Sequence, residues 1–136
     1  MYIWKKEKQI WMFEGLDGAG KGTAIKNLLA NLPYWLPLDN VLHRREPGGG
    51  KLGEMCRMAL IQNARRGAYI GRLEEYLYFW TGRFDLWRDI CDWFSLEGNE
   101  SGNVFLDRSF ASTYAYQIFA RNAPSYLRET FREMVL

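Results

Sequence analysis

Short apolar runs alternate with longer amphipathic segments along the whole chain. Three runs have the length and composition of buried strands, namely residues 10–14, 41–44 and 104–107. Between and after them, apolar positions recur at helical spacing in residues 23–32, 52–62, 73–94, 112–121 and 125–136. Strands that alternate with helices in this way predict an α/β fold, with a parallel sheet and right-handed crossover connections.

The longest predicted helix, residues 73–94, has two faces of different character. Its apolar positions follow one another at steps of four and three, which predicts a continuous stripe for packing on a sheet or on another helix. The stripe consists of Leu73, Leu77, Trp80, Phe84, Trp87, Cys91 and Phe94. We expect the opposite face, with Asp85, Asp89 and an ion pair between Arg88 and Asp92, to be solvated.

The composition is that of an ordinary soluble domain. The chain has 136 residues, of which 48% are hydrophobic and 25% are charged, and its formal net charge is +2. These values exclude a disordered, collagen-like or disulfide-scaffold protein, and the length favours a single domain with a basic extension at residues 1–8. Because the basic residues are spread along the chain, nothing indicates nucleic-acid binding.

The sequence also favours a cytoplasmic location with no membrane partner. No stretch approaches the roughly 20 apolar residues of a membrane span, and charged residues at 5–8 occupy the place where a signal peptide needs its apolar region. Cys56 and Cys91 lie far apart and lack the spacing of metal ligands. We therefore expect two free thiols, as is usual in a reducing compartment.

The clearest chemical signal lies between the first predicted strand and the first predicted helix. Residues 15–23 read Gly-Leu-Asp-Gly-Ala-Gly-Lys-Gly-Thr. Such glycines let successive backbone N–H groups turn toward a phosphate, and the following helix directs its positive end to the same point. Gly22 stands where the general pattern has a magnesium-ligating Ser or Thr. We expect phosphate contacts from Gly15, Gly18, Ala19, Gly20, Lys21, Gly22 and Thr23.

A second signal is the pair Asp107 and Arg108, directly after the third predicted strand. A carboxylate at the carboxyl end of a strand beside a phosphate loop can hold Mg²⁺ or its waters, and the arginine can neutralise a transferring phosphoryl group. Without the loop, the same pair is more often a structural ion pair. Together with the loop, it predicts Mg²⁺ held by Asp107 and Thr23, partly through water, and catalytic roles for Lys21 and Arg108.

Four separated segments, in the same order along the chain, resemble the thymidylate kinase family. They are residues 13–21 (FEGLDGAGK); 45–49 (REPGG) with 52–54 (LGE) and Arg57; 77–79 (LYF) with Arg83; and 107–108 (DR) with 112–113 (ST) and 115–117 (AYQ). The resemblance implies a P-loop NTPase fold of three layers, α/β/α. It also implies Mg²⁺-dependent phosphorylation of dTMP to dTDP with ATP as donor, and a homodimer paired through helices, for which Trp80 and Trp87 are candidates.

The resemblance further implies a set of dTMP-binding residues. Phe79 would stack on the thymine ring while Arg83, four residues later, reads the ring edge; the alternatives are core packing for Phe79 and a surface charge for Arg83. Tyr116 would crowd a ribose 2′-hydroxyl, or is otherwise a half-buried helix aromatic. The whole implied set is Asp17, Glu46, Arg57, Phe79, Arg83, Arg108, Thr113, Tyr116 and Gln117.

The resemblance runs from residue 10 to about residue 117, whereas family members continue with a fourth strand, a basic lid helix, a fifth strand and a loop that contacts adenine. We therefore expect the C-terminal strands and the lid to be missing, and residues 10–14 to form an open apolar edge of the sheet. Two alternatives to an active enzyme stay open. One is a non-catalytic nucleotide-binding or dimerisation fragment without the lid, and the other is a kinase for another deoxynucleoside monophosphate.

Overall fold

A small parallel sheet forms the centre of the protein, for which a computed structural model describes residues 7–34 and 36–135. Its strands are β1 (Gln9–Phe13), β2 (Val41–Arg45) and β3 (Asn103–Asp107), and they lie in the order β1-β3-β2. Phe13 and Arg45 both pair with Asp107, so the three strands end at the same edge. All three predicted strands are confirmed as strands, but only β3 is largely buried. Most of the predicted N-terminal extension lies outside the described residues.

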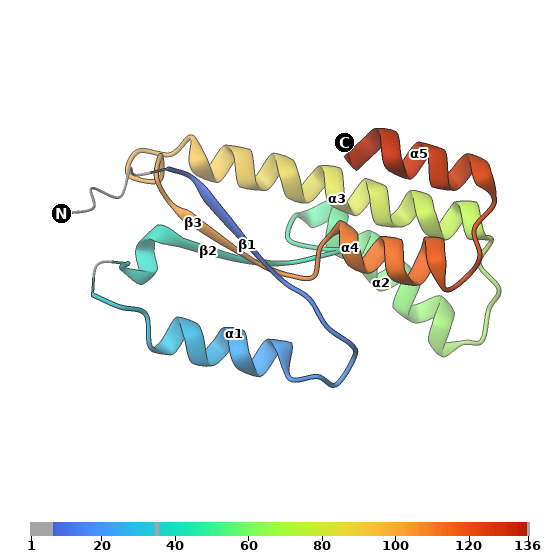
Figure 1. Cartoon of the computed structure of the whole chain (residues 1–136), viewed down its shortest axis with the longest axis horizontal. Coiled ribbons are helices and arrows are strands. Elements are labelled where there is room, and N and C mark those ends of the chain that lie inside the picture. The colour runs from blue at the N-terminus through green and yellow to red at the C-terminus, as the bar shows by residue number, and fades with distance from the viewer. Residues whose placement is uncertain (1–6, 35, 136) are drawn as a thin grey trace.

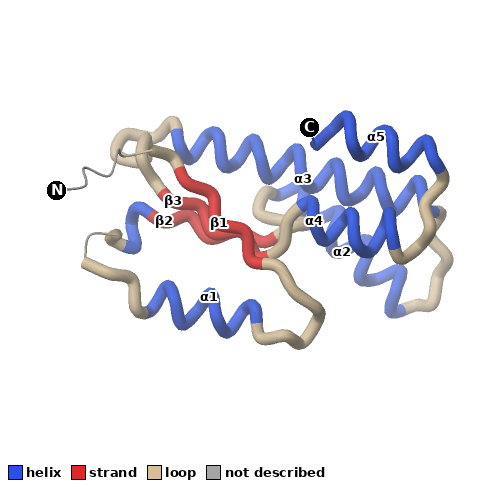
Figure 2. The backbone as a smooth tube through the Cα atoms, in the orientation of Figure 1, coloured by secondary structure: helices blue, strands red, loops and turns tan. Residues whose placement is uncertain are grey.

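Helices cover both faces of this sheet, which confirms the three-layer arrangement. Helix α1 (Lys21–Ala30) runs along one face and α3 (Arg72–Phe94) along the other (Figure 1). Figure 2 shows the strands between these two layers, with the other helices beyond the carboxyl ends of the strands. Those elements are α2 (Lys51–Arg65), α4 (Phe110–Thr113), the π-helical segment η2 (Tyr114–Phe119) and α5 (Ser125–Val135), and a 3-10 turn, Leu38–Asn40, precedes β2.

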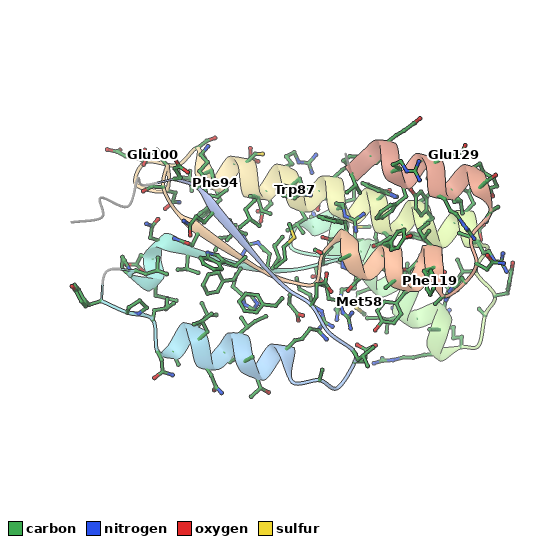
Figure 3. All side chains as sticks on the ribbon, viewed as in Figure 1. Met58, Trp87, Phe94, Glu100, Phe119 and Glu129 are labelled. Atoms are coloured by element: carbon green, nitrogen blue, oxygen red, sulfur yellow. The ribbon has the colours of Figure 1, made fainter. Side chains whose placement is uncertain are left out.

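Two apolar clusters form the core, one at each half of α3. The first lies between the sheet and the C-terminal half of α3, where Trp87 and Phe94 are labelled in Figure 3. Its buried members are Leu42, Leu86, Ile90, Phe94, Val104 and Leu106. The second joins the N-terminal half of α3 to η2 and α5, through Tyr76, Trp80, Ile118, Ala123, Leu127 and Phe131. Helix α3 is therefore the element that holds the sheet and the C-terminal helices together.

The predicted division of α3 into one apolar and one solvated face is wrong in part. Trp80 and Phe94 are buried as expected, but Leu73, Leu77 and Phe84 are exposed. Asp85, assigned to the solvated face, is buried and bonded to α2, and Arg88 pairs with Asp85 rather than with Asp92. The physical reason is that α3 packs on the sheet, on α2 and on η2 at different points along its length, so more than one face is buried.

Strand β1 forms the open edge that the sequence predicts. Within the described residues it pairs with β3 alone, and the Trp11 side chain is 50% exposed. Met12 is exposed as well, so apolar side chains stand beside unpaired backbone groups. No helix in the described parts of the chain is both long and apolar enough to cross a lipid bilayer.

Candidate nucleotide site

The loop between β1 and α1 has the backbone geometry of a phosphate cradle. Gly18 and Gly20 have φ angles of 79° and 84°, in the left-handed region that side chains disfavour. Gly20 then precedes the first turn of α1, whose free N–H groups and helix dipole attract an anion. The predicted strand–loop–helix context is confirmed.

Lys21 folds back over this loop. Its Nζ donates to the carbonyl oxygens of Gly15 and Leu16 at 2.9 and 2.8 Å, which places the ammonium group across the loop. A phosphate group in the cradle would replace these two carbonyl acceptors with charged oxygens, and such charge-assisted bonds are stronger. Thr23 is exposed in the first turn of α1.

Arg108 joins the phosphate loop to the sheet edge. Its backbone N–H donates to the carbonyl oxygen of Phe13 at 3.0 Å, and its guanidinium forms an ion pair with Asp17 of the loop. The φ angle of Arg108 is 76°, a conformation that costs a non-glycine residue about 1–3 kcal/mol. The surrounding contacts therefore hold this residue in an unfavourable backbone geometry that directs its side chain toward the loop.

Ser112 of the next turn bonds the Arg108 side chain and shares the Glu14 carboxylate with Ser109. Its Nη1 donates to the Ser112 hydroxyl at 3.1 Å, and Ser112 in turn donates to Glu14 at 2.6 Å. Ser109 donates to the other carboxylate oxygen of Glu14 at 2.6 Å and accepts the N–H of Ala111 at the start of α4. Glu14 therefore links the end of β1 to both serines.

A cavity of about 500 Å³ opens beside Arg108, between α2, α3 and η2. It collects seven of the nine predicted dTMP-binding residues: Asp17, Glu46, Arg57, Phe79, Arg108, Tyr116 and Gln117. Segments from four distant parts of the sequence thus meet in one cavity, as the motifs predict. The other two predicted residues, Arg83 and Thr113, are not part of its lining.

Arg83 and Thr113 are buried directly behind Glu46. The Arg83 Nε donates to Glu46 at 2.5 Å, and its Nη2 donates both to Glu46 and to the Thr113 hydroxyl, the latter at 2.8 Å. Arg83 and Glu46 are only 3% and 4% exposed, yet the Arg83 Nη1 has no partner within the described residues. A buried donor without a partner is costly, and it is one that a ligand can satisfy.

Aromatic rings support the arginines of the site. The Arg83 guanidinium lies 4.4 Å from the ring centroid of Trp80, and the Arg108 guanidinium lies 5.6 Å from that of Tyr116. Both separations are within the range of cation–π attraction. The alternative of a surface charge for Arg83 is therefore wrong. Phe79 is half-buried and lines the cavity, so its side chain is not simply packed in the core.

The residues predicted to hold Mg²⁺ lie at the carboxyl edge of the sheet and in the first turn of α1. Within the described chain, no group of three His, Cys, Asp or Glu side chains could hold a metal ion. Asp107 pairs with Arg45 at 3.7 Å through one oxygen, and its other oxygen, Oδ1, is buried without a partner. A single carboxylate with spare acceptor capacity fits Mg²⁺, which takes most of its remaining ligands from nucleotide phosphates and water.

The structure adds cavity residues to which the motifs assign no role. Arg45, Ser112 and Arg121 contribute polar groups, and Pro47, Leu60, Ile61 and Ala120 contribute apolar walls. Arg45, Pro47 and Ser112 stand within matched segments, and Arg121 follows Gln117 at helical spacing, so the sequence could have pointed to these four. Leu60, Ile61 and Ala120 carry no such signal.

A parallel sheet covered on both faces, with a glycine-rich loop and a lysine between its first strand and helix, defines a P-loop α/β nucleotide-binding protein. Comparison with known proteins narrows this class. The sequence profile described as thymidylate kinase matches residues 13–135, and the chain belongs to the thymidylate kinase family.

Individual relatives agree with this assignment. The chain is 33% identical to a thymidylate kinase of Vibrio parahaemolyticus over 123 residues, which are 90% of this chain and 56% of the relative. It is 35% identical to that of Chlorobium limicola over 119 residues, which are 87% of this chain and 50% of the relative. The chain thus spans about half the length of these curated relatives.

A solved structure shows the same fold. The crystal structure of thymidylate kinase from Ehrlichia chaffeensis superimposes with a TM-score of 0.77 at 28% sequence identity, covering 96% of this chain and 66% of the other. The α/β/α arrangement described above is therefore that of a solved thymidylate kinase over nearly all of this chain.

Proposed function

We propose that this chain carries the acceptor site and the phosphate loop of an enzyme that phosphorylates dTMP to dTDP with ATP as donor. The observation that carries the proposal is the position of Arg108, which pairs with Asp17 of the phosphate loop and also lines the 500 Å³ cavity. One guanidinium thus stands between the place for a donor phosphate and the place for an acceptor phosphate. Arg83, buried behind the lining residue Glu46, holds that carboxylate through its guanidinium.

Each residue then has a physical task in the proposed reaction. An oxygen of the dTMP phosphate forms a bond to the γ-phosphorus of ATP, and the bond from that phosphorus to the β,γ-bridging oxygen breaks, leaving ADP. The acceptor oxygen is already ionised, so no general base is required. Lys21 and Arg108 offset the repulsion between the two phosphate groups, and Arg57 adds a second cation beside the acceptor.

The proposal includes Mg²⁺ held by Asp107 together with the nucleotide phosphates, with Thr23 reached through water. When bound, Mg²⁺ neutralises charge on the β- and γ-phosphates. The Asp107 Oδ1, which is buried and has no partner among the described residues, is the atom that would contact the ion or its water.

The test is an ADP-production assay with ATP, Mg²⁺ and dTMP, combined with a dTMP titration followed by tryptophan fluorescence. Trp80 lies under Arg83 and provides the signal. We expect Lys21→Ala and Arg108→Ala each to lower turnover at least about 100-fold. Lys26→Ala, on the exposed side of α1, is the matched control and should leave turnover unchanged. Circular dichroism confirms that the variants fold.

The same measurements separate the alternatives. Binding of dTMP without any turnover would support a non-catalytic nucleotide-binding module. A tighter response to AMP than to dTMP would overturn the substrate assignment, and absence of any nucleotide response would overturn the proposal as a whole.

We also propose that the protein is a cytoplasmic homodimer. Leu73, Leu77 and Phe84 are exposed along one stripe of α3, and an exposed apolar stripe is a common pairing surface. Of the two predicted pairing residues, Trp80 is buried inside the chain, and Trp87 is partly buried against the first core cluster. Cys56 and Cys91 are both free, which fits a reducing compartment.

A further inference from the structure

The Glu75 carboxylate lies behind the acceptor cavity and binds two of its lining residues. Its Oε1 accepts a hydrogen bond from the Gln117 Nε2 at 3.3 Å, and its Oε2 forms an ion pair with Arg121. Gln117 and Arg121 line the acceptor cavity, whereas Glu75 lines only a neighbouring cavity of about 450 Å³. Glu75 is only 8% exposed, so water compensates little of its charge, and these two partners do so instead.

This contact decides which end of the Gln117 amide faces Glu75. A carboxylate offers only lone pairs, so the amide must turn its NH₂ group toward it. The amide oxygen of Gln117 is then the polar atom left for the cavity, and it is a hydrogen-bond acceptor. Arg121 holds the second carboxylate oxygen, which keeps the carboxylate from rotating away from Gln117.

We propose that Glu75 is a positioning residue that fixes the Gln117 amide oxygen toward the base and so makes the site select 4-oxo pyrimidines over cytosine. This inference rests on the proposed function, because it takes the acceptor cavity to hold a pyrimidine. The 4-oxo pyrimidines, thymine and uracil, present an N3–H donor beside an O4 acceptor, whereas cytosine presents an N3 acceptor beside an N4 donor. The Gln117 amide oxygen can accept the N3–H of the first pattern, whereas it meets the N3 lone pair of the second.

Replacing Glu75 by glutamine tests the role without changing the shape of the side chain. In Glu75→Gln, Arg121 retains the amide oxygen of the new side chain, so the new NH₂ group faces Gln117. Two NH₂ groups cannot bond each other, so Gln117 turns its amide oxygen toward residue 75 and its NH₂ group toward the cavity. The site then offers a donor opposite N3, which suits cytosine.

The experiment measures dTMP and dCMP affinities of the whole chain by tryptophan fluorescence. We expect the ratio of dTMP to dCMP affinity to fall at least about tenfold in Glu75→Gln, because a mismatched buried hydrogen bond costs this much or more. Glu129→Gln, on the exposed outer side of α5 (Figure 3), is the matched control and should leave the ratio unchanged. A purely structural role would weaken both nucleotides equally, and an unchanged ratio in Glu75→Gln overturns the inference.

A second measurement needs neither nucleotide nor variant. In the wild-type chain, we expect hydrogen exchange of the Gln117 side-chain amide, followed by NMR, to be about tenfold slower than that of Gln62, which is exposed and makes no described side-chain hydrogen bond. Equal exchange rates overturn the inference even if Glu75→Gln does not fold. Slow exchange together with absent dTMP binding would instead reject the proposed function and leave the Glu75–Gln117 contact intact.

Discussion

At the scale of single residues, burial and hydrogen bonding compete at Glu46. Burial raises the pKa of the Glu46 carboxyl above its ordinary value, and the Arg83 guanidinium only partly opposes this. A carboxyl whose pKa is higher in the folded than in the unfolded chain stabilises the fold most below its ordinary pKa. That contribution is lost as the pH rises through the folded-state pKa, because ionisation then has to occur inside the protein.

Glu46→Gln removes this titration and leaves the shape of the side chain unchanged. We expect the free energy of unfolding of the wild-type chain, minus that of the variant, to fall as the pH rises from about 4.5 to neutral. Urea denaturation across this pH range provides the measurement. A difference that grows with pH would mean that Arg83 outweighs burial and lowers the pKa of Glu46.

Ser109 and Ser112 bind the same carboxylate but differ in their second partner. Ser112 accepts a hydrogen bond from Arg108, so Ser112→Ala should loosen the contact between Arg108 and the dTMP phosphate. We therefore expect the affinity for dTMP to fall several-fold and the affinity for thymidine, which has no phosphate, to stay unchanged. Ser109→Ala is the matched variant. It loses the bond to the Ala111 N–H and should cost about 1 kcal/mol of stability without this preference between ligands. Titrations with both ligands and thermal unfolding distinguish the two effects, and equal weakening of dTMP and thymidine in Ser112→Ala would contradict the assignment.

At the scale of elements, a side chain of α3 caps the N-terminus of α2. Gly50 precedes α2 and has no side chain to bond the free N–H groups of the first turn. Asp85 of α3 supplies the acceptor instead, since its Oδ2 accepts the Gly53 N–H at 2.8 Å. A Cβ atom on Gly50 would lie 2.1 Å from the same oxygen, which explains why glycine stands there.

Asp85→Ala removes the acceptor and leaves the buried Gly53 N–H without this partner. We expect a loss of about 1–3 kcal/mol in the free energy of unfolding, measured by urea denaturation. Asp92→Ala, on the exposed face of the same helix, should change stability by less than about 0.5 kcal/mol. An equal effect of the two substitutions would show that the contact between Asp85 and α2 does not contribute.

The strands and helices follow from the sequence, but the burial of α3 does not. Continuous apolar runs suffice to locate β1 and β3, because both are short and end at turn residues. A periodic pattern assumes one buried face, whereas Asp85 and Glu75 are buried by partners that lie far away in the sequence. Local sequence cannot reveal such partners.

The sequence likewise predicts the motif residues of the candidate site but not the residues that support them. Motif residues such as Asp17 and Arg108 carry their own signal, and the structure brings them together. The positions of Glu14 and Glu75 behind the site depend on which serine, glutamine or arginine they meet after folding. Those contacts are set by the packing of β1, α3 and η2, and no spacing along the chain encodes them.

At the scale of the whole molecule, two exposed apolar surfaces predict two kinds of association. The stripe on α3 is a side-chain surface, and two copies can bury it against each other and close the assembly as a symmetric pair. The edge of β1 offers backbone N–H and C=O groups next to Trp11, and such an edge recruits further strands without closing. The first surface should therefore give dimers, and the second should give larger aggregates.

Charge placed on each surface in turn separates the two contributions. Phe84 is 58% exposed, and Phe84→Glu should convert the proposed dimer to a monomer in sedimentation equilibrium, because a desolvated carboxylate is costly in an apolar interface. Trp11→Lys should leave the dimer intact and suppress the growth of light scattering with concentration, since lysine on an edge strand opposes further pairing. Tyr34→Lys, at an exposed aromatic residue outside any strand, controls for the added charge. A wild-type chain that stays monomeric at high concentration would reject the pairing through α3. Aggregation that persists in Trp11→Lys would show that a surface other than the β1 edge causes it.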